Sequence, residues 1–496
     1  MLKQPRNCER HTKEQNKREI PGRASPLHGI TQEIANFAIG TKFNDLPKEV
    51  VHESKRILLD CIGCGLAGLG TDKGKTAAEM ARKLGGAGEA TIVGIGDSSS
   101  YFGASFANAE LINAMDYEVL CGGHISALTL ASSLALAEGM KASGKELIRA
   151  IAIAHEIGCR LGTALPTAQG EDLEKPGLPP VAGWNYAIFG GTAGAGTLLN
   201  LDQHQMVHAL GIAGYMVPAQ AVKKFVSTVP VARAKYAPVG WINQAELTAA
   251  FLAQIGQTGD TTVLEGEYGF WRYIGSSKWE SAAMMKELGQ SWRFSSLTVY
   301  KLYPCCGVLS AALDCFINII DENKLQPEDI DGVRIYLDPR CEEPVWRNNE
   351  IETDMEAQFS VAYNISVAAH RVNIGWKWQD SNTYQNPKIL EFMKKVSFSP
   401  HPDYAKIVKE DPTARPNRAD VIAKGRTFSQ ERKHPKGASI NKATRITDEE
   451  LVDKFQNNAN RILLPSKIDK ATEAILSLEK IANVSKLIEL VTVQER

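Results

Sequence analysis

The sequence predicts a mainly α-helical protein, with a large all-helical domain formed by both ends of the chain and a smaller inserted α+β domain. Three observations predict this fold class. Apolar residues recur at intervals of three and four from Thr31 to about Gly256. Alanine and glycine are dense over the same region, which suits helices that pack closely. After Trp292, short alternating segments typical of strands occur between the helices.

A chain of 496 residues is too long for one ordinary hydrophobic core, so we expect two or three domains. The first residues are polar and lack the apolar segment of a secretory signal, which predicts a disordered extension. The expected segments are 1–29 for this extension, 30–292 for the first part of the helical domain, 293–437 for the α+β domain, which we call the lid domain, and 438–496 for the C-terminal part of the helical domain.

The pattern of residues predicts the following elements in chain order. Residues 125–140 and the glycine-rich run 190–196 favour closely packed helices. In the lid domain we expect strands over 294–301 and 332–337, helices over 308–322 and 357–369, and weaker strands over 420–423 and 426–431. Thr447 and Glu450 form a capping box that opens a helix, and two amphipathic helices are expected over 469–478 and 484–491.

Composition excludes several classes of function. The chain is 44% hydrophobic and 23% charged, with a net charge of -1, so nothing favours nucleic acid or an anionic membrane as a partner. No apolar run reaches the roughly 18 residues of a membrane span. Nine cysteines, an odd number without an export signal, favour a cytoplasmic location. Cys61 and Cys64 lie in an apolar helical pattern that is typical of core packing.

Cofactor motifs are weak in this chain. The glycines at 94–96 and 190–196 lack the strand context of a dinucleotide site, and neither a Walker A loop nor a Gly-x-Ser-x-Gly elbow is present. The ten histidines are scattered, and His204 and His208, although four residues apart, have no partnering acid pattern. We therefore expect no metal and no organic cofactor.

The segment 108–124 is the most informative part of the chain. It begins as a small-residue helix, breaks at Cys121-Gly-Gly and delivers His124 to the start of the next helix. Asp116 precedes this break and is expected to be half-buried, so it needs a partner. A carboxylate and an imidazole on either side of a glycine break can converge on one cleft, as proton transfer requires. A structural histidine remains the alternative.

Three further residues are candidates for the same site. Lys235 and Lys301 lie among apolar and aromatic neighbours, where an ammonium group can hold a substrate carboxylate. Tyr363 lies on a predicted helix, where core packing is the alternative to a catalytic role.

Several motifs, taken in order, resemble the MmgE/PrpD family. They are the segment 108–124, Leu-Leu-Asp-Cys-Ile-Gly at 58–63, Gly-Trp-Asn-Tyr at 183–186, Lys-Leu-Tyr-Pro-Cys-Cys-Gly at 301–307, Gln-Phe-Ser-Val-Ala-Tyr at 358–363 and His-Pro-Lys-Gly at 434–437. The resemblance covers about residues 30–490. It implies a helical domain with a lid domain, a homodimer, and chemistry without a cofactor. The active-site positions that it implies are Asp116, His124, Lys235, Lys301 and Tyr363, with Asn185 and Tyr186 as further substrate-binding positions.

The resemblance implies a lyase, a dehydratase or decarboxylase, that acts on a small di- or tricarboxylate by proton transfer next to a carboxylate. One alternative is an epimerase in which Tyr186 and either Lys235 or His124 serve as two bases. A non-catalytic paralogue is the other, because four positions that often carry histidine in the family carry other residues here: Asn113, Asn185, Pro238 and Ser310.

Overall fold

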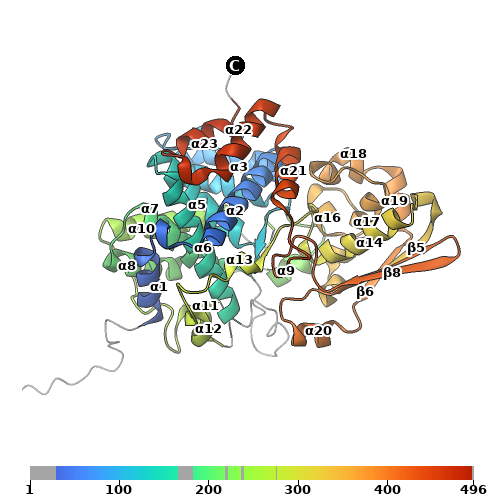
Figure 1. The fold of residues 1–496 in the computed structure, drawn as a ribbon, viewed down its shortest axis with the longest axis horizontal. Helices are drawn as coiled ribbons and strands as arrows, with labels where there is room; N and C mark the ends of the chain where they lie inside the picture. The colour runs from blue at the N-terminus through green and yellow to red at the C-terminus, as the bar shows by residue number, and fades with distance from the viewer. Residues whose placement is uncertain are drawn as a thin grey trace, which may run out of the picture.

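The computed structural model describes residues 29–165, 183–217, 222–235, 239–274, 276 and 278–493. The predicted N-terminal extension, except Gly29, and Pro238 lie outside the described residues. The fold is mainly α-helical, as predicted, and its sheets are small. Figure 1 shows the helical body beside the lid, whose strands lie at the far edge of the molecule.

Six helices form the centre of the helical body, and they pack on one another along much of their lengths. They are α2 (Lys48–Gly68), α4 (Tyr101–Asn113), α5 (Ile125–Gly139), α6 (Gly144–Ala164), α7 (Ile188–Leu198) and α10 (Val239–Gln254). Glycine permits the closest approach. A Cβ on Gly190 of α7 would lie 2.3 Å from the carbonyl oxygen of Ala154 on α6. The glycine-rich run is therefore a packing feature, as predicted.

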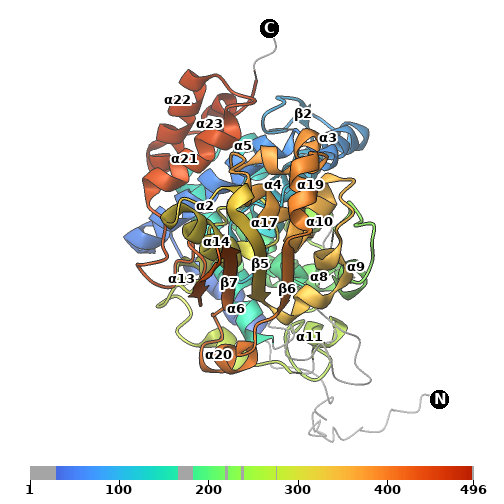
Figure 2. The same cartoon turned by 90° about the vertical axis from the view of Figure 1, so that its right-hand side faces the viewer.

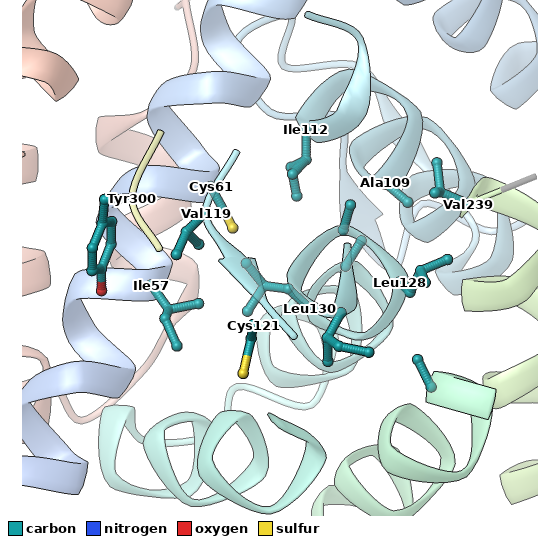
Figure 3. Packing of buried hydrophobic residues seen from close by; sticks show 14 of the residues in the cluster. Ile57, Cys61, Ala109, Ile112, Val119, Cys121, Leu128, Leu130, Val239 and Tyr300 are labelled. Carbon is teal, nitrogen blue, oxygen red and sulfur yellow. The ribbon is translucent and has the colours of Figure 1, made fainter. Parts of the chain in front are cut away.

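The remaining elements up to residue 299 surround this centre. The helices are α1 (Ile30–Gly40), α3 (Asp72–Leu84), α8 (Gln203–Met216), α9 (Val222–Val226), α11 (Phe270–Tyr273), α12 (Ser281–Met285) and α13 (Phe294–Leu297). Strand β1 (Ala90–Thr91) pairs with β2 (Ser98–Ser99), and β3 (Leu120–Cys121) pairs with β4 (Thr298–Val299), both antiparallel. Figure 3 shows Val119 and Cys121 beside Ile57 of α2, with Leu130 of α5 nearby.

The lid contains a four-stranded sheet with the order β6-β5-β7-β8. Its strands are β5 (Ile330–Leu337), β6 (Val396–Pro400), β7 (Asn417–Ala423) and β8 (Arg426–Arg432). Strand β6 runs parallel to β5, whereas β7 is antiparallel to both β5 and β8. Helix α14 (Ser310–Glu322) packs on β7 and β8, and α17 (Val361–Ala369) packs on α14 and β6 (Figure 2).

Shorter helices complete the lid. They are α15 (Pro344–Arg347), α16 (Asp354–Phe359), α18 (Ser381–Tyr384), α19 (Pro387–Met393) and α20 (Tyr404–Glu410). The C-terminal segment then returns to the helical body as α21 (Asp448–Ala459), α22 (Pro465–Leu476) and α23 (Ser485–Leu490), with α21 and α22 packed on α2. The Thr447–Glu450 capping box is present at the start of α21, as predicted.

Two local predictions need correction, and one strand was missed. Residues 294–301, predicted as a strand, begin with α13 and contain only the two-residue strand β4, because only Thr298 and Val299 find strand partners in β3. The helix predicted over 357–369 is two helices, since the extended backbone of Ser360 separates α16 from α17. Strand β6 was not predicted, because it lies at the sheet edge within a Pro-rich, charged stretch.

Three further observations concern the membrane and the cysteines. Within the described ranges, the helices are either too short or too polar to cross a lipid bilayer. Cys61 and Cys64 are buried in α2 as unpaired thiols, which agrees with the predicted core packing. Cys121 and Cys159 are joined by a disulfide between β3 and α6.

Candidate active site

The site is built on the turn between α4 and α5. Helix α4 ends at Asn113, and Asp116 adopts a left-handed backbone conformation with φ 52°, which costs a non-glycine residue roughly 1–2 kcal/mol. Gly122 and Gly123 also have positive φ, at 67° and 142°. The backbone therefore turns at Asp116 and again at Gly122 and Gly123, and His124 forms the N-cap of α5.

The helical domain holds this turn from one side through a buried ion pair. Asp60 of α2 accepts a hydrogen bond from the backbone N–H of Val119 at 2.7 Å and one from Lys454 of α21 at 2.7 Å. The Lys454 ammonium also donates to the carbonyl oxygen of Tyr117 at 2.8 Å and lies 3.9 Å from the centre of its ring. The aspartate of the 58–63 motif thus anchors the strand that follows Asp116.

The lid holds the same turn from the other side. The amide groups of Gln358 and Gln379 donate to the carbonyl oxygens of Ala114 and Met115, at 2.9 and 2.8 Å. Lys301 donates to the carbonyl oxygen of Asp116 at 2.7 Å. The backbone that leads into Asp116 is therefore fixed by side chains of the lid.

Lys301 also forms an ion pair with the Asp116 side chain, with Nζ 2.6 Å from Oδ1. Both side chains are at most 1% exposed. Burial alone would raise the pKa of Asp116, but the ammonium groups of Lys301 and Lys235 and the imidazole of His124 outweigh it and hold that pKa below its usual value. Burial alone would lower the pKa of Lys301, but Asp116 and Glu118 outweigh it and raise that pKa. The pair is therefore ionised.

His124 lies between two carboxylates. Its Nδ1 is 2.6 Å from Oε1 of Glu118, and its Nε2 is 3.6 Å from Oδ1 of Asp116. Burial alone would raise the pKa of Glu118, but His124 and Lys301 outweigh it and lower the pKa to about 2. Sequence reasoning named Asp116 as the partner that orients His124 and missed Glu118. The available signal was that Glu118 lies two residues after Asp116, in the same short segment before the glycine break.

Lys235 reaches the same turn from the loop before α10. Its Nζ donates to the carbonyl oxygen of Asn113 at 2.8 Å, and its backbone is left-handed with φ 54°. Burial lowers the pKa of Lys235 to about 8; the Asp116 carboxylate opposes this shift and the Lys73 ammonium adds to it. Near pH 8, Lys235 is thus a buried group that is present in both its ammonium and its neutral amine form.

Trp184 covers the imidazole of His124 from the 183–186 motif. The two rings meet edge to face, with centroids 4.9 Å apart. Asn185 and Tyr186, the predicted substrate-binding residues that follow Trp184, lie in the short helix η3 (Asn185–Ala187) and are at most 3% exposed. The Tyr186 hydroxyl lies against Gly162 of α6, and burial raises the pKa of this tyrosine.

Two other positions singled out in the sequence, Tyr363 and Ser310, lie on helices of the lid. The Tyr363 hydroxyl, whose pKa is raised by burial, donates to the carbonyl oxygen of Trp378 within the lid. Ser310 is buried at the start of α14, and its hydroxyl has no hydrogen-bond partner among the described residues. The structure thus joins Asp116, His124, Lys235 and Lys301 around one turn and places the Tyr363 hydroxyl on a backbone oxygen.

Asp116, Glu118 and His124 also have the spacing of metal ligands, since one ligand atom from each lies within 4.8 Å of the others. The atoms that would bind a metal already form hydrogen bonds within the protein: Lys301 contacts Asp116 Oδ1, and Glu118 Oε1 contacts His124 Nδ1. A cation placed there would also meet the ammonium groups that shift the pKa of Asp116. Charge and contacts therefore favour a site for an anion and for proton transfer.

The fold and the site together define a mainly α-helical protein whose helical body and lid enclose a carboxylate–imidazole–ammonium cluster. The MmgE/PrpD N-terminal domain matches residues 32–282, and the MmgE/PrpD C-terminal domain matches residues 303–480. The chain belongs to the MmgE/PrpD family.

Curated relatives align over almost the whole chain. A cis-aconitate decarboxylase of Aspergillus terreus is 23% identical over 490 residues, which cover 93% of this chain and 96% of the relative. The cis-aconitate decarboxylase of Homo sapiens is 25% identical over 483 residues, covering 94% and 95%. The cis-aconitate decarboxylase-like protein oryM of Aspergillus oryzae is 22% identical over 503 residues, covering 95% and 98%.

Proposed function

We propose that this protein is a cofactor-independent lyase that acts on a small di- or tricarboxylate by proton transfer next to a carboxylate. The observation that carries the proposal is the position of His124, whose Nε2 lies 3.6 Å from Asp116 in a cluster that also contains Lys235 and Lys301. The names of the curated relatives support a lyase reaction on a carboxylate.

Decarboxylation needs few groups in this site. Lys235 binds a carboxylate of the substrate as a point charge, and its partner cation Lys301 keeps Asp116 ionised. The carbon–carbon bond to the departing carboxylate breaks, and CO₂ leaves. The electron pair that remains on the substrate takes a proton from the imidazolium Nε2 of His124, and the ring regains a proton from water. Nearby ammonium groups stabilise the charge on the substrate while this pair is exposed.

Dehydration is the second form of the same proposal. Here the neutral Nε2 of His124 removes the proton next to the carboxylate, the carbon–oxygen bond breaks, and the hydroxyl group leaves as water after it receives a proton. Tyr363 would supply that proton only after its hydroxyl leaves the carbonyl oxygen of Trp378. Decarboxylation needs no second acid, so we favour it over dehydration.

An epimerase is a candidate from another class, and the pKa of Lys235, about 8, supports it. An amine with this pKa is partly neutral near pH 8 and can serve as a base opposite His124. Tyr186, the other expected base, has its hydroxyl against Gly162. If the reaction releases neither water nor CO₂, we therefore assign Lys235 and His124 as the two bases of an epimerase.

The substrate is proposed as a class. Asn113, Asn185 and Ser310 are neutral at positions where imidazoles are often found in the family, so the positive charge of the cluster comes from Lys235 and from Lys301, which is paired with Asp116. This difference favours a substrate with fewer or differently placed carboxylates. We also propose that the protein is a homodimer, which light scattering on the purified chain will test, and that it is cytoplasmic, which fractionation of cells that express it will test.

Incubation with unsaturated and hydroxylated di- and tricarboxylates in D₂O, followed by NMR, distinguishes these reactions. Cis-aconitate is the first acid to include. Loss of CO₂ with deuterium at the adjacent carbon supports the decarboxylase, appearance of a double bond supports the dehydratase, and exchange with inversion supports the epimerase. Asp116→Asn and Lys235→Ala should abolish turnover. Turnover that survives both substitutions, or its absence with every acid, contradicts the proposal and favours a non-catalytic paralogue.

A further inference from the structure

The orientation of the Asn113 side chain is set by a buried lysine. Lys73 of α3 places its ammonium 3.0 Å from Oδ1 of Asn113, and Asn113 is fully buried. An ammonium group only donates hydrogen bonds, so the oxygen of the amide must face it. The amide nitrogen therefore faces the other way, where it lies 2.7 Å from Oε1 of Glu118.

Lys73 is itself fixed in place. Its ammonium is 2.9 Å from Oε2 of Glu110 on α4, and Oε1 of Glu110 accepts a hydrogen bond from the backbone N–H of Gly240 on α10 at 2.8 Å. Three helices of the body thus hold the group that orients Asn113.

Glu118 then accepts two hydrogen bonds at one oxygen. Oε1 receives the Asn113 amide and lies 2.6 Å from Nδ1 of His124, whereas Oε2 makes no hydrogen bond with the described residues. An ionised carboxylate only accepts, so Nδ1 of His124 must carry a proton. The Asn113 nitrogen, 3.5 Å from Nδ1, is also a donor and offers this ring nitrogen no acceptor.

This arrangement decides which imidazole nitrogen exchanges protons. With Nδ1 held as a donor, a neutral His124 has its lone pair on Nε2, the nitrogen nearer Asp116. Without Asn113, Glu118 would keep only His124 as a donor among the described residues, and a buried carboxylate with one donor is free to turn or to take up a proton.

We propose that Asn113, oriented by Lys73, is a positioning residue that keeps Glu118 on Nδ1 of His124, so that Nε2 alone transfers protons. The proposal rests on the proposed function for the role of His124, but the position of the proton does not depend on turnover. In this proposal neither Asn113 nor Lys73 contacts the substrate.

The test is an NMR measurement of the imidazole protons in the full chain labelled with ¹⁵N-histidine, with His124→Gln used to assign the signals. The neutral ring of His124 should show a proton on Nδ1, shifted strongly downfield by its short hydrogen bond, and a bare Nε2. Asn113→Leu should move this proton upfield or replace part of it by a proton on Nε2. Lys73→Met should act in the same direction, and Lys73→Arg, which keeps a donor, should restore the wild-type signal.

Asn108→Leu is a matched control, because Asn108 is a buried asparagine of the same helix whose side-chain hydrogen bonds, within the described part of the chain, go to the backbone of Thr91 and Val93. It should lower stability yet leave the His124 signal unchanged. If turnover is found, Asn113→Leu should lower kcat by roughly 10- to 100-fold, part of what acid–base catalysis supplies, with KM little changed.

A proton on Nε2 in the wild type, or a His124 signal that Asn113→Leu leaves unchanged in a folded protein, overturns this inference even if the lyase activity is found. Asn113→Leu retains the Lys73–Glu110 pair, so it stays informative if Lys73→Met fails to fold. Conversely, the expected NMR signals can be found while the protein converts none of the tested acids. That result overturns the proposed function but supports the positioning role of Asn113.

Discussion

The ion pair between Asp116 and Lys301, with 2.6 Å between Oδ1 and Nζ, joins the helical body to the first turn of the lid. Asp116 lies after α4, and Lys301 follows β4, 185 residues further along the chain. The pair therefore has two roles: it closes the contact between the domains and it keeps a carboxylate ionised beside His124.

Breaking this pair from one side should destabilise the protein strongly. Asp116→Asn leaves the Lys301 ammonium buried without its counter-charge, and Lys301→Met does the same to the carboxylate. Each should lower the free energy of unfolding by about 3–5 kcal/mol. The double variant Asp116→Asn/Lys301→Met should lose much less than the sum, as measured by urea denaturation. Additive losses would contradict a direct pairing.

The pH dependence of catalysis should report Lys235. Its pKa is lowered to about 8, so the ammonium form that binds a carboxylate is present below pH 8 and is lost as the pH rises through that value. We expect kcat/KM to fall above about pH 8, and Lys235→Arg, which stays charged, to move that limb to higher pH. A rising limb near pH 8 that disappears in Lys235→Arg would instead make Lys235 a base and support the epimerase.

Gly123 should tolerate no side chain. Its φ is 142°, and a Cβ on it would lie 2.0 Å from Cδ1 and Nε1 of Trp184, the ring that packs on His124. Gly123→Ala should cost about 1–3 kcal/mol of stability through this overlap and displace Trp184, which tryptophan fluorescence will detect. Gly122→Ala is the matched variant, since Gly122 has φ 67° but open space around its Cβ position. Equal effects of the two substitutions would exclude the Trp184 contact as the cause.

A buried acid away from the site should control stability against pH. Glu246 of α10 is fully buried, and burial raises its pKa well above 4.5, although Ser132 donates to it at 2.5 Å. The folded state therefore holds a proton that the unfolded chain loses near pH 4.5. Its stabilising contribution is complete below that pH and falls as the pH rises through the folded pKa, by up to about 1.4 kcal/mol per pH unit.

Glu246→Gln, which is neutral at every pH, should remove this decline, as urea denaturation at several pH values will reveal. Glu267→Gln at an exposed position is the control and should leave the decline in place. A wild-type stability that rises with pH across this range would mean that Glu246 is ionised in the folded protein.

Local chemistry was sufficient to predict many elements. The capping box at Thr447 specifies the start of α21 because its hydrogen bonds are made within four residues. The 190–196 run specifies a packed helix because glycine allows a neighbouring backbone to approach. The structure of residues 294–301 was harder to predict, because a strand of two residues depends on its partner β3 more than on the alternation of apolar and polar residues in its own sequence.

The residues of the candidate site also differ in how far the sequence could predict them. Asp116, His124, Lys235 and Lys301 could be found from the sequence, because each stands at a glycine break or in a loop with an unusual setting. Glu118 was missed, since the sequence does not reveal which nitrogen of His124 a carboxylate will meet. Lys73, 40 residues before Asn113, carried no signal of its own.

The sequence by itself determined the mainly helical fold, the family and the residue types that gather at the turn between α4 and α5, because these depend on local periodicity and on motifs read in order. Only the tertiary structure decided the pairings: Lys301 with Asp116, Glu118 with Nδ1 of His124, and Tyr363 with Trp378. The physical reason is that a buried charge or hydroxyl takes the partner that packing brings within about 3 Å, and packing joins segments that are distant in the chain.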